Sequence, residues 1–242
     1  MKKRTTKEIL RAYKKKGYFL DERPFAMNIF GIRTNNTNSG QFDDILGYLY
    51  KDGDGKWHSV QSAGTTDTGT YWLNNIWSGQ KGSAILSEGQ YKNAYQLGTH
   101  YSYTAFVQTG GKVTIYRDYN RDSILDYDNA TKESGFFGIN LHRAKSSGKT
   151  EYIEKYSAGC QVWQDVNDFN DALEFGKKHK ERYENKFTYT LFDERNDFRR
   201  KTRFALITAG LLSVVYFYWN WVKGKSFKTT YKDIKTKITN LI

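Results

Sequence analysis

Between residues 25 and 160, apolar and polar positions follow the pattern of short strands. Runs rich in aromatic and β-branched side chains are separated by turns that contain glycine, such as residues 52–55 and 109–112. This spacing predicts a series of hairpins without a long helix between them. The expected strands are residues 25–32, 45–50, 56–61, 84–86, 95–97, 103–108, 113–116 and 136–142.

Helical spacing appears later in the chain. Residues 165–183 place apolar side chains three and four positions apart, with Asp165 or Asn167 as an N-cap. Phe187, Tyr189 and Leu191 then alternate with polar residues, as in a last strand. We therefore expect a mainly β (α+β) domain over residues 24–197, with one or two helices near its end.

The first 23 residues are rich in lysine and arginine. Ile9, Leu10 and Tyr13 have a spacing that allows a short amphipathic helix. No apolar run of about 7–15 residues follows the charges, so the segment does not resemble a secretory signal peptide. We expect residues 1–23 to form a solvated basic arm. A segment that binds anionic lipid or nucleic acid is the alternative.

Residues 204–222 contain no charged side chain, and basic residues flank them on both sides. A membrane-spanning helix needs about 20 mostly apolar residues, and aromatic side chains gather at its ends. The run predicts a transmembrane helix within residues 198–242, whose basic tail suits a membrane surface. An interfacial helix or a buried core helix is the alternative.

The formal net charge of +12 is unevenly distributed. Residues 1–23 contribute +6 and residues 198–242 contribute +9, which leaves −3 for residues 24–197. A basic groove for nucleic acid is therefore not expected in the central domain. The charge instead surrounds the apolar C-terminal run, as expected for a protein associated with a membrane.

The chain has one cysteine, Cys160, which excludes an intrachain disulfide and a cysteine-rich zinc site. Small residues precede it, and they let the backbone turn sharply and present amides to an oxyanion. His142 lies 18 residues earlier, at the end of an expected strand. The two side chains are a candidate nucleophile and base. A buried cysteine beside a structural histidine is the alternative.

His142, the interval of 18 residues and Ser-Ala-Gly-Cys at 157–160 resemble the active-site signature of the L,D-transpeptidases, the YkuD-type peptidoglycan enzymes. The chain departs from that signature at Arg143, Ala158 and Val162, where the family has Gly, often His, and Arg or Asn. Residues 25–169 are also similar to an uncharacterised, often phage-associated group, through Gly-Ile-Asn-Leu-His-Arg-Ala and Ser-Ala-Gly-Cys-Gln-Val.

This resemblance implies a β-sandwich-like, L,D-transpeptidase-type catalytic domain that acts on peptidoglycan stem peptides. Cys160 would be the nucleophile, His142 its base, and the amides of Gly159 and Cys160 would hold the oxyanion. The implied activity is an L,D-transpeptidase, L,D-carboxypeptidase or endopeptidase of a phage or prophage, acting without a cofactor at the cell envelope or in a virion. A non-catalytic cell-wall-binding or virion structural protein on the same scaffold is the alternative.

A second candidate site is an aspartate-rich segment. Its oxygens occupy positions 1, 3, 5 and 9 of a calcium-loop pattern, but Ser123 replaces the glycine and Asn129 the final glutamate. The segment is either a structural Ca²⁺ loop or a solvated hairpin turn. The candidate ligands are Asp118, Asn120, Asp122, Asp126 and Asp128. The remaining histidines are expected at the surface or in the core: His58, His100 and His179.

Overall fold

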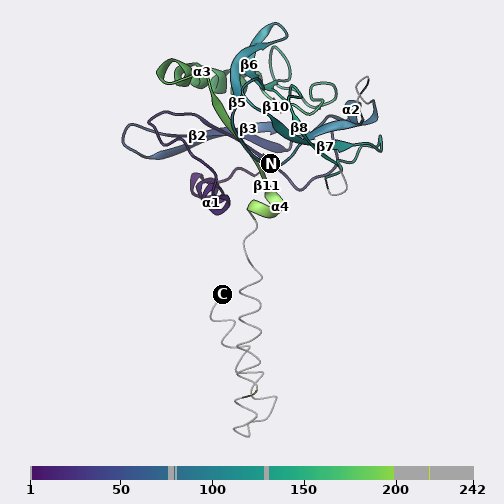
Figure 1. Ribbon diagram of the computed structural model, residues 1–242, viewed down its shortest axis with the longest axis horizontal. Helices are drawn as coiled ribbons and strands as arrows, with labels where there is room; N and C mark the ends of the chain where they lie inside the picture. Colours follow the sequence, from purple (N-terminus) through teal and green to yellow (C-terminus); the bar gives the residue numbers. More distant parts are fainter. Residues whose placement is uncertain (1, 76–78, 80, 128–130, 199–217, 219–242) are drawn as a thin grey trace. The chain divides into compact units, whose positions relative to one another are not determined.

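The computed structural model describes residues 2–75, 79, 81–127, 131–198 and 218. The chain divides into two compact units, Met1–Phe198 and Arg199–Ile242. In the first unit, eight strands close into a barrel in the order β1-β11-β5-β6-β9-β10-β3-β2, and a smaller sheet has the order β4-β7-β8 (Figure 1). The barrel strands are β1 Asn28–Arg33, β2 Asp44–Lys51, β3 Trp57–Thr65, β5 Gly89–His100, β6 Tyr103–Val107, β9 Leu141–Arg143, β10 Gln161–Trp163 and β11 Phe187–Asp193. The small sheet contains β4 Ser83–Leu86, β7 Val113–Asp118 and β8 Lys132–Gly135.

Two of the neighbouring strand pairs in the barrel are parallel, and the other neighbouring pairs are antiparallel. β1 pairs with β11, so that Ile29 lies opposite Tyr189, and β9 pairs with β10, so that His142 lies opposite Val162. Parallel strands are usually covered on both faces. Every residue of β1 and β11 is accordingly buried.

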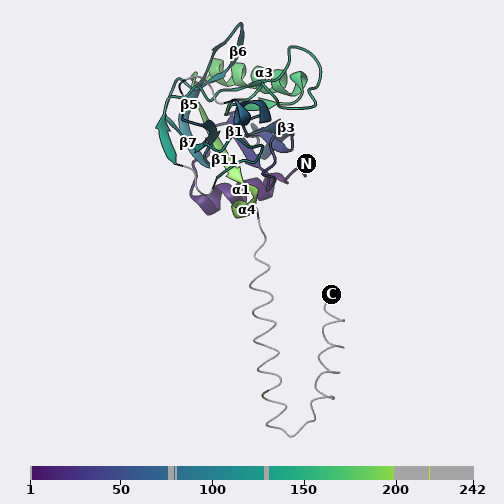
Figure 2. The ribbon, with the colours of Figure 1, turned by 90° about the vertical axis from the view of Figure 1, so that its right-hand side faces the viewer.

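The main hydrophobic core joins the barrel, the small sheet and one long helix. It includes Ile29 of β1, Leu86 of β4, Ile115 of β7 and Phe169 of α3. That helix, α3 Val166–Arg182, lies along the barrel (Figure 2). Asp165 caps it, because its side chain accepts the amide hydrogen of Asn167. The short helices are α2 Thr70–Asn74 and α4 Glu194–Asp197.

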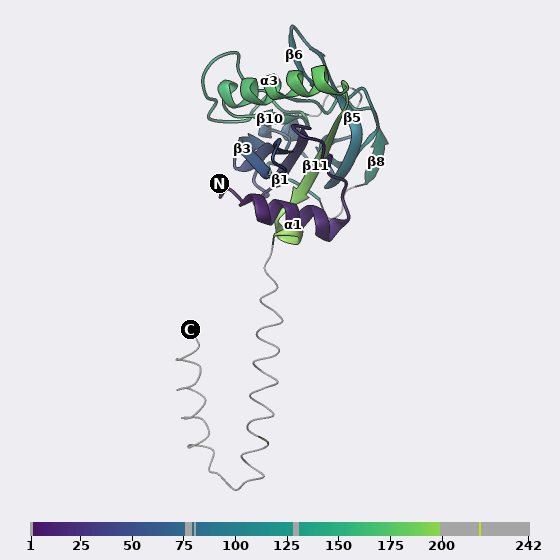
Figure 3. The same cartoon turned by 90° about the vertical axis from the view of Figure 1, so that its left-hand side faces the viewer.

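The N-terminal helix, α1 Thr6–Lys16, is part of the first unit (Figure 3). Thr5 and Glu8 form a capping box at its start, and Gly17 ends it in the left-handed conformation. Ile9 and Tyr13 are buried in a second core, together with residues of β1, β2 and β11. The expected solvated arm over residues 1–23 is therefore wrong, because burial of this apolar stripe holds the helix on the barrel.

The mainly β fold is confirmed, and two details of it differ from expectation. The large sheet closes on itself, whereas a sandwich consists of two open sheets packed face to face. The expected strand over residues 136–142 is reduced to Leu141–Arg143. The side chain of Gln108 accepts hydrogen bonds from the amides of Phe137 and Ile139 at 3.1 Å, and these bonds hold the preceding residues as a loop.

None of the described helices is long and apolar enough to cross a membrane. The expected transmembrane helix at residues 204–222 and the basic tail lie outside the described residues, apart from Tyr218.

Candidate functional site

His142 lies in β9, and Cys160 directly precedes β10, which runs parallel to β9. Gln161 pairs with Leu141, and its amide donates to the carbonyl of Asn140 at 2.9 Å. Cys160 therefore lies beside Asn140, diagonal to His142. Neighbouring strands lie about 4.8 Å apart and rise about 3.3 Å per residue, which puts the two Cα atoms at about 8 Å. The two sequence candidates are thus brought together.

Cys160 borders a cavity of about 200 Å³. Its thiol is part-buried and has two long contacts: the amide of Asn140 donates to Sγ at 3.4 Å, and Sγ donates to the carbonyl of Gly138 at 3.5 Å. Both partners belong to the loop that replaces the expected strand. The cavity is lined by Ala84, Arg117, Phe137, Gly138, Ile139, Ala158 and Cys160.

His142 is buried and held in one tautomer. Its Nδ1 lies 2.8 Å from the carbonyl oxygen of Arg143, which only accepts hydrogen bonds. Nδ1 therefore carries the proton, and Nε2 keeps the lone pair that a general base needs.

A third residue, His100, belongs to this cluster and was missed by the sequence analysis. Its ring stacks on His142 with centroids 4.4 Å apart. The Asn140 carboxamide accepts from the amide of Gln108 at 2.8 Å, so its nitrogen donates to His100 Nδ1 at 3.1 Å. Asn140 lies two residues before His142, a spacing that puts two residues on the same face of a strand. That spacing was the signal available for Asn140, whereas the position of His100 depends on the β5–β6 hairpin.

Burial keeps both candidate groups neutral near pH 7. Desolvation raises the pKa of the Cys160 thiol to about 11, and the amide of Asn140 opposes this only in part. Desolvation, with a smaller contribution from His100, lowers the pKa of His142 to about 3. Among the described residues, no hydrogen bond joins the thiol to the imidazole. The resting arrangement is therefore a thiol beside a neutral base.

The backbone before Cys160 requires glycine at position 159. Gly159 has φ +118°, and a Cβ there would lie 2.7 Å from the carbonyl oxygen of Ala84. Its amide donates to the Ser157 hydroxyl at 3.2 Å, so this amide is already engaged. The Cys160 amide has no hydrogen bond to another described residue. Of the two amides expected to hold an oxyanion, only that of Cys160 is available.

The residues that depart from the L,D-transpeptidase signature have different surroundings. Arg143 stacks on the ring of Tyr103 at 4.3 Å, and Val162 is fully buried. Neither of them lines the cavity beside Cys160, whereas the third, Ala158, does. The cavity also has a cation from another strand, Arg117, whose guanidinium pairs with Glu133 at 3.1 Å.

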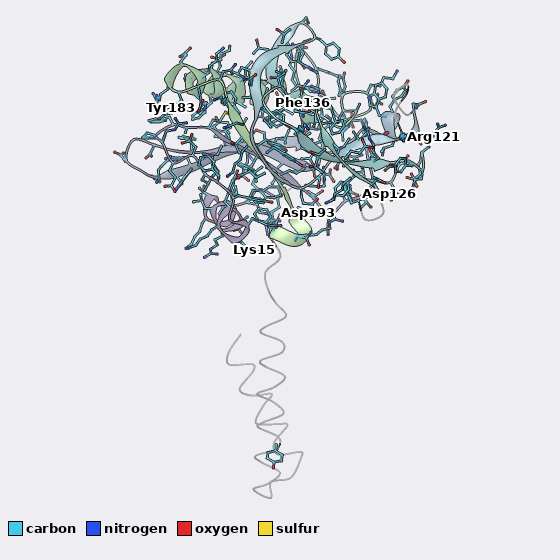
Figure 4. The ribbon with its side chains drawn as sticks, in the orientation of Figure 1. Lys15, Arg121, Asp126, Phe136, Tyr183 and Asp193 are labelled. Atoms are coloured by element: carbon cyan, nitrogen blue, oxygen red, sulfur yellow. The ribbon has the colours of Figure 1, made fainter. Side chains whose placement is uncertain are left out.

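The aspartate-rich segment follows β7 and lies at the margin of the domain, where Figure 4 labels Arg121 and Asp126. The Asn120 amide donates to the carboxylates of Asp122 and Asp126 at 3.0 and 2.7 Å. Burial raises the pKa of Asp118, with a further contribution from the charge of Asp126. Over the described part of the chain, no three His, Cys, Asp or Glu side chains form a group that could hold a metal ion. Asp128 lies outside the described residues, so the calcium loop stays a prediction.

The other two histidines serve the structure. His58 pairs with Asp52 at 2.6 Å. His179 is buried, and its Nδ1 accepts the amide hydrogen of Met27 at 3.1 Å.

Comparison with protein-family models, curated proteins and solved structures finds no match for this chain.

Proposed function

We propose that this protein is a peptidoglycan-modifying cysteine enzyme of the L,D-transpeptidase type. The observation that carries the proposal is the parallel pairing of β9 and β10. Cys160 directly precedes β10 and borders a cavity, and His142 of the neighbouring β9 has a tautomer that suits a general base.

In the proposed reaction, Nε2 of His142 takes the thiol proton as Sγ of Cys160 attacks the carbonyl carbon of a stem-peptide amide. The carbonyl oxygen gains the negative charge and accepts the Cys160 amide hydrogen. The C–N bond then breaks, the leaving amine takes the proton from His142, and an acyl thioester remains. Attack by water completes hydrolysis, whereas attack by an acceptor amine completes transpeptidation.

We propose that Arg117 orients the substrate within the cavity. Stem peptides carry carboxylates, and a guanidinium matches the geometry of a carboxylate. Glu133 is part-exposed and its carboxylate pairs with Arg117, so a substrate carboxylate would compete with it. This role takes the place of the Arg or Asn that Val162 replaces.

The setting of the reaction is also a proposal. Peptidoglycan lies outside the inner membrane, and the apolar run at residues 204–222 would attach the protein to a membrane. We infer a phage or prophage protein that acts at the cell envelope or as a virion component.

The test is incubation of the full-length chain with purified peptidoglycan, with the muropeptides analysed by mass spectrometry. We expect new products with the wild type and none with Cys160→Ala. His58→Gln is the matched control for a histidine change away from the site, and it should leave the products unchanged. Wild-type muropeptides that do not differ from those of Cys160→Ala would contradict the catalytic proposal.

A non-catalytic cell-wall-binding protein is the second candidate function. Two observations favour this candidate. The pKa of the Cys160 thiol is raised, and the thiol makes no hydrogen bond with His142. A thiol that is not activated is a poor nucleophile. This candidate predicts that wild type and Cys160→Ala bind sacculi equally and that neither changes the muropeptides.

A further inference from the structure

The exposed face of α1 carries cations that form no ion pair with the described residues of the domain. Lys7, Arg11 and Lys14 lie about one turn apart on the helix, and all three are exposed. None of them pairs with an acidic side chain among the described residues. The one acidic residue of the helix, Glu8, is held in the capping box. Positive charge therefore predominates on this face.

Other cations of the same segment fasten α1 to α4. The ammonium of Lys15 donates to the carbonyl of Asn196 at 2.7 Å, and Lys16 pairs with Asp197 at 3.0 Å. Arg4 pairs with Glu194. Figure 4 places Lys15 at the same end of the domain as Asp193, which caps α4. These contacts fix the rotation of α1, so that the unpaired cations face outward.

A shallow apolar groove of about 440 Å³ lies among these cations. Leu10 of α1 and Trp57 of β3 line it and are both part-exposed. A tryptophan and a leucine surrounded by lysine and arginine suit the headgroup region of a bilayer, where one part of the surface is apolar and the rest is charged.

The neighbourhood of α4 favours lipid over nucleic acid as the partner. α4 ends at Asp197, and the uncharged run of the sequence begins seven residues later, at residue 204. Seven residues reach at most about 25 Å when fully extended. A bilayer that takes up this run would therefore come close to α4 and to the helix fastened to it.

We propose that Lys7, Arg11 and Lys14, with Leu10 and Trp57, form a docking surface for the anionic headgroups of a bilayer. The surface acts independently of the chemistry at Cys160. Each cation near an anionic membrane strengthens binding about fivefold, so three of them contribute about 100-fold.

The test compares two triple variants of the full-length chain. Lys7→Gln/Arg11→Gln/Lys14→Gln neutralises the α1 face, and Lys112→Gln/Lys145→Gln/Lys149→Gln removes the same charge from other exposed lysines. Both keep residues 198–242, whose contribution therefore cancels. Partitioning is measured by co-sedimentation with phosphatidylcholine vesicles, with and without phosphatidylserine. We expect the α1 variant to lose about 100-fold of its preference for anionic vesicles and the matched variant to stay near wild type.

Equal losses in the two variants, or no loss in the α1 variant, would overturn the proposal. A loss of affinity for a DNA duplex without a loss on vesicles would overturn it in favour of nucleic acid. If circular dichroism shows that the triple variant is misfolded, the single variants Lys7→Gln and Arg11→Gln replace it. Each should then lose about fivefold, and an unchanged vesicle preference in both would refute the docking surface.

Discussion

Two polar clusters lie inside this domain, and they differ in how completely their hydrogen bonds are made. Around Arg33, every nitrogen of the guanidinium is engaged. Its Nε donates to Thr66 and pairs with Asp67 at 2.9 Å, Nη1 donates to Leu86 and Nη2 donates to the Thr66 carbonyl. Asp67 also accepts from the hydroxyl of Tyr127. A charge is tolerated in a protein interior when it is paired and hydrogen-bonded in this way.

Around Cys160, the contacts are fewer and longer. The thiol lies 3.4 and 3.5 Å from its two partners, and His142 has one hydrogen bond, through Nδ1. Groups that must exchange a proton need an atom that is not already committed. The Arg33 cluster therefore has its hydrogen bonds made, whereas in the Cys160 cluster the thiol has only long contacts and Nε2 of His142 has no hydrogen bond to another described residue.

The two clusters are connected through Gln161, the residue after Cys160. The nitrogen of its side-chain carboxamide donates to the Thr66 carbonyl at 3.4 Å, and the carboxamide oxygen accepts from the Tyr189 hydroxyl at 2.8 Å. A substitution in one cluster can therefore be used to test whether the properties of the other cluster change with it.

The largest expected effect is on catalysis. His142→Gln removes the proposed base, and we expect the rate of muropeptide turnover to fall about 10²- to 10⁴-fold. The free energy of unfolding should change little by comparison. Initial rates with purified peptidoglycan, together with urea unfolding of the same samples, check both parts. Turnover equal to that of His58→Gln would show that His142 is not the base.

The next effect is on stability. Arg33→Met leaves Asp67 buried without its cation, and we expect the free energy of unfolding to fall by about 3–5 kcal/mol. Lys145→Met, at an exposed position, is the control and should stay within about 0.5 kcal/mol of wild type. Denaturant unfolding followed by tryptophan fluorescence measures the difference. A small change in Arg33→Met would mean that the cluster is not built for stability.

A third effect concerns the thiol. The pKa of Cys160 is raised to about 11, so the reactive thiolate forms only at high pH. We expect iodoacetamide to label the folded chain about 10²-fold more slowly at pH 7 than an unfolded control, in which the thiol pKa is about 8.5. Labelling rates between pH 6 and 11 give the pKa directly. A midpoint below pH 7 would instead reveal a thiolate–imidazolium pair.

The last effect is the pH dependence of stability set by Asp44. Burial and the nearby charge of Asp67 raise the pKa of Asp44 to about 8, so the folded protein binds more protons than the unfolded chain between about pH 4 and 8. The contribution of Asp44 to the free energy of unfolding is therefore greatest below about pH 4. It decreases as the pH rises and is lost once the pH passes about 8. The slope is at most about 1.4 kcal/mol per pH unit.

Asp44→Asn should flatten this slope. Unfolding curves for the wild type and the variant at pH 5 and pH 8.5 measure it. A wild-type stability that increases over this interval would have the wrong sign for a protonated Asp44.

Local features were predictable from the sequence, and the protein confirms several of them. The hairpin turn between β2 and β3 lies where glycine marked it. The second expected hairpin turn, at residues 109–112, is wrong, because it connects β6 of the barrel to β7 of the small sheet and these strands do not pair. Asp165 caps α3, one of the two caps expected. His142 lies in β9 and Cys160 directly precedes β10, the neighbouring strand, in line with the expected strand and return. Each of these depends on a few consecutive residues or on one short connection.

The features that were missed depend on segments far apart in the chain. His100 reaches the site because β6 pairs with both β5 and β9. Residues 136–140 form a loop because the side chain of Gln108, about 30 residues earlier, accepts hydrogen bonds from the amides of Phe137 and Ile139. The Arg33 cluster gathers residues from β1, β2 and the segments around Thr66 and Tyr127. No local pattern in the sequence predicts these contacts between residues far apart in the chain.

The mainly β character, the start of α3, the uneven charge and the candidate residues Cys160 and His142 could all be read from the sequence. Long-range packing was needed to close the sheet into a barrel and to place α1 on it with its cations outward. It also decided that the thiol and the imidazole are both neutral at rest. The physical reason is desolvation: the pKa of a side chain and the free energy of burying a helix face depend on which distant residues exclude water from them.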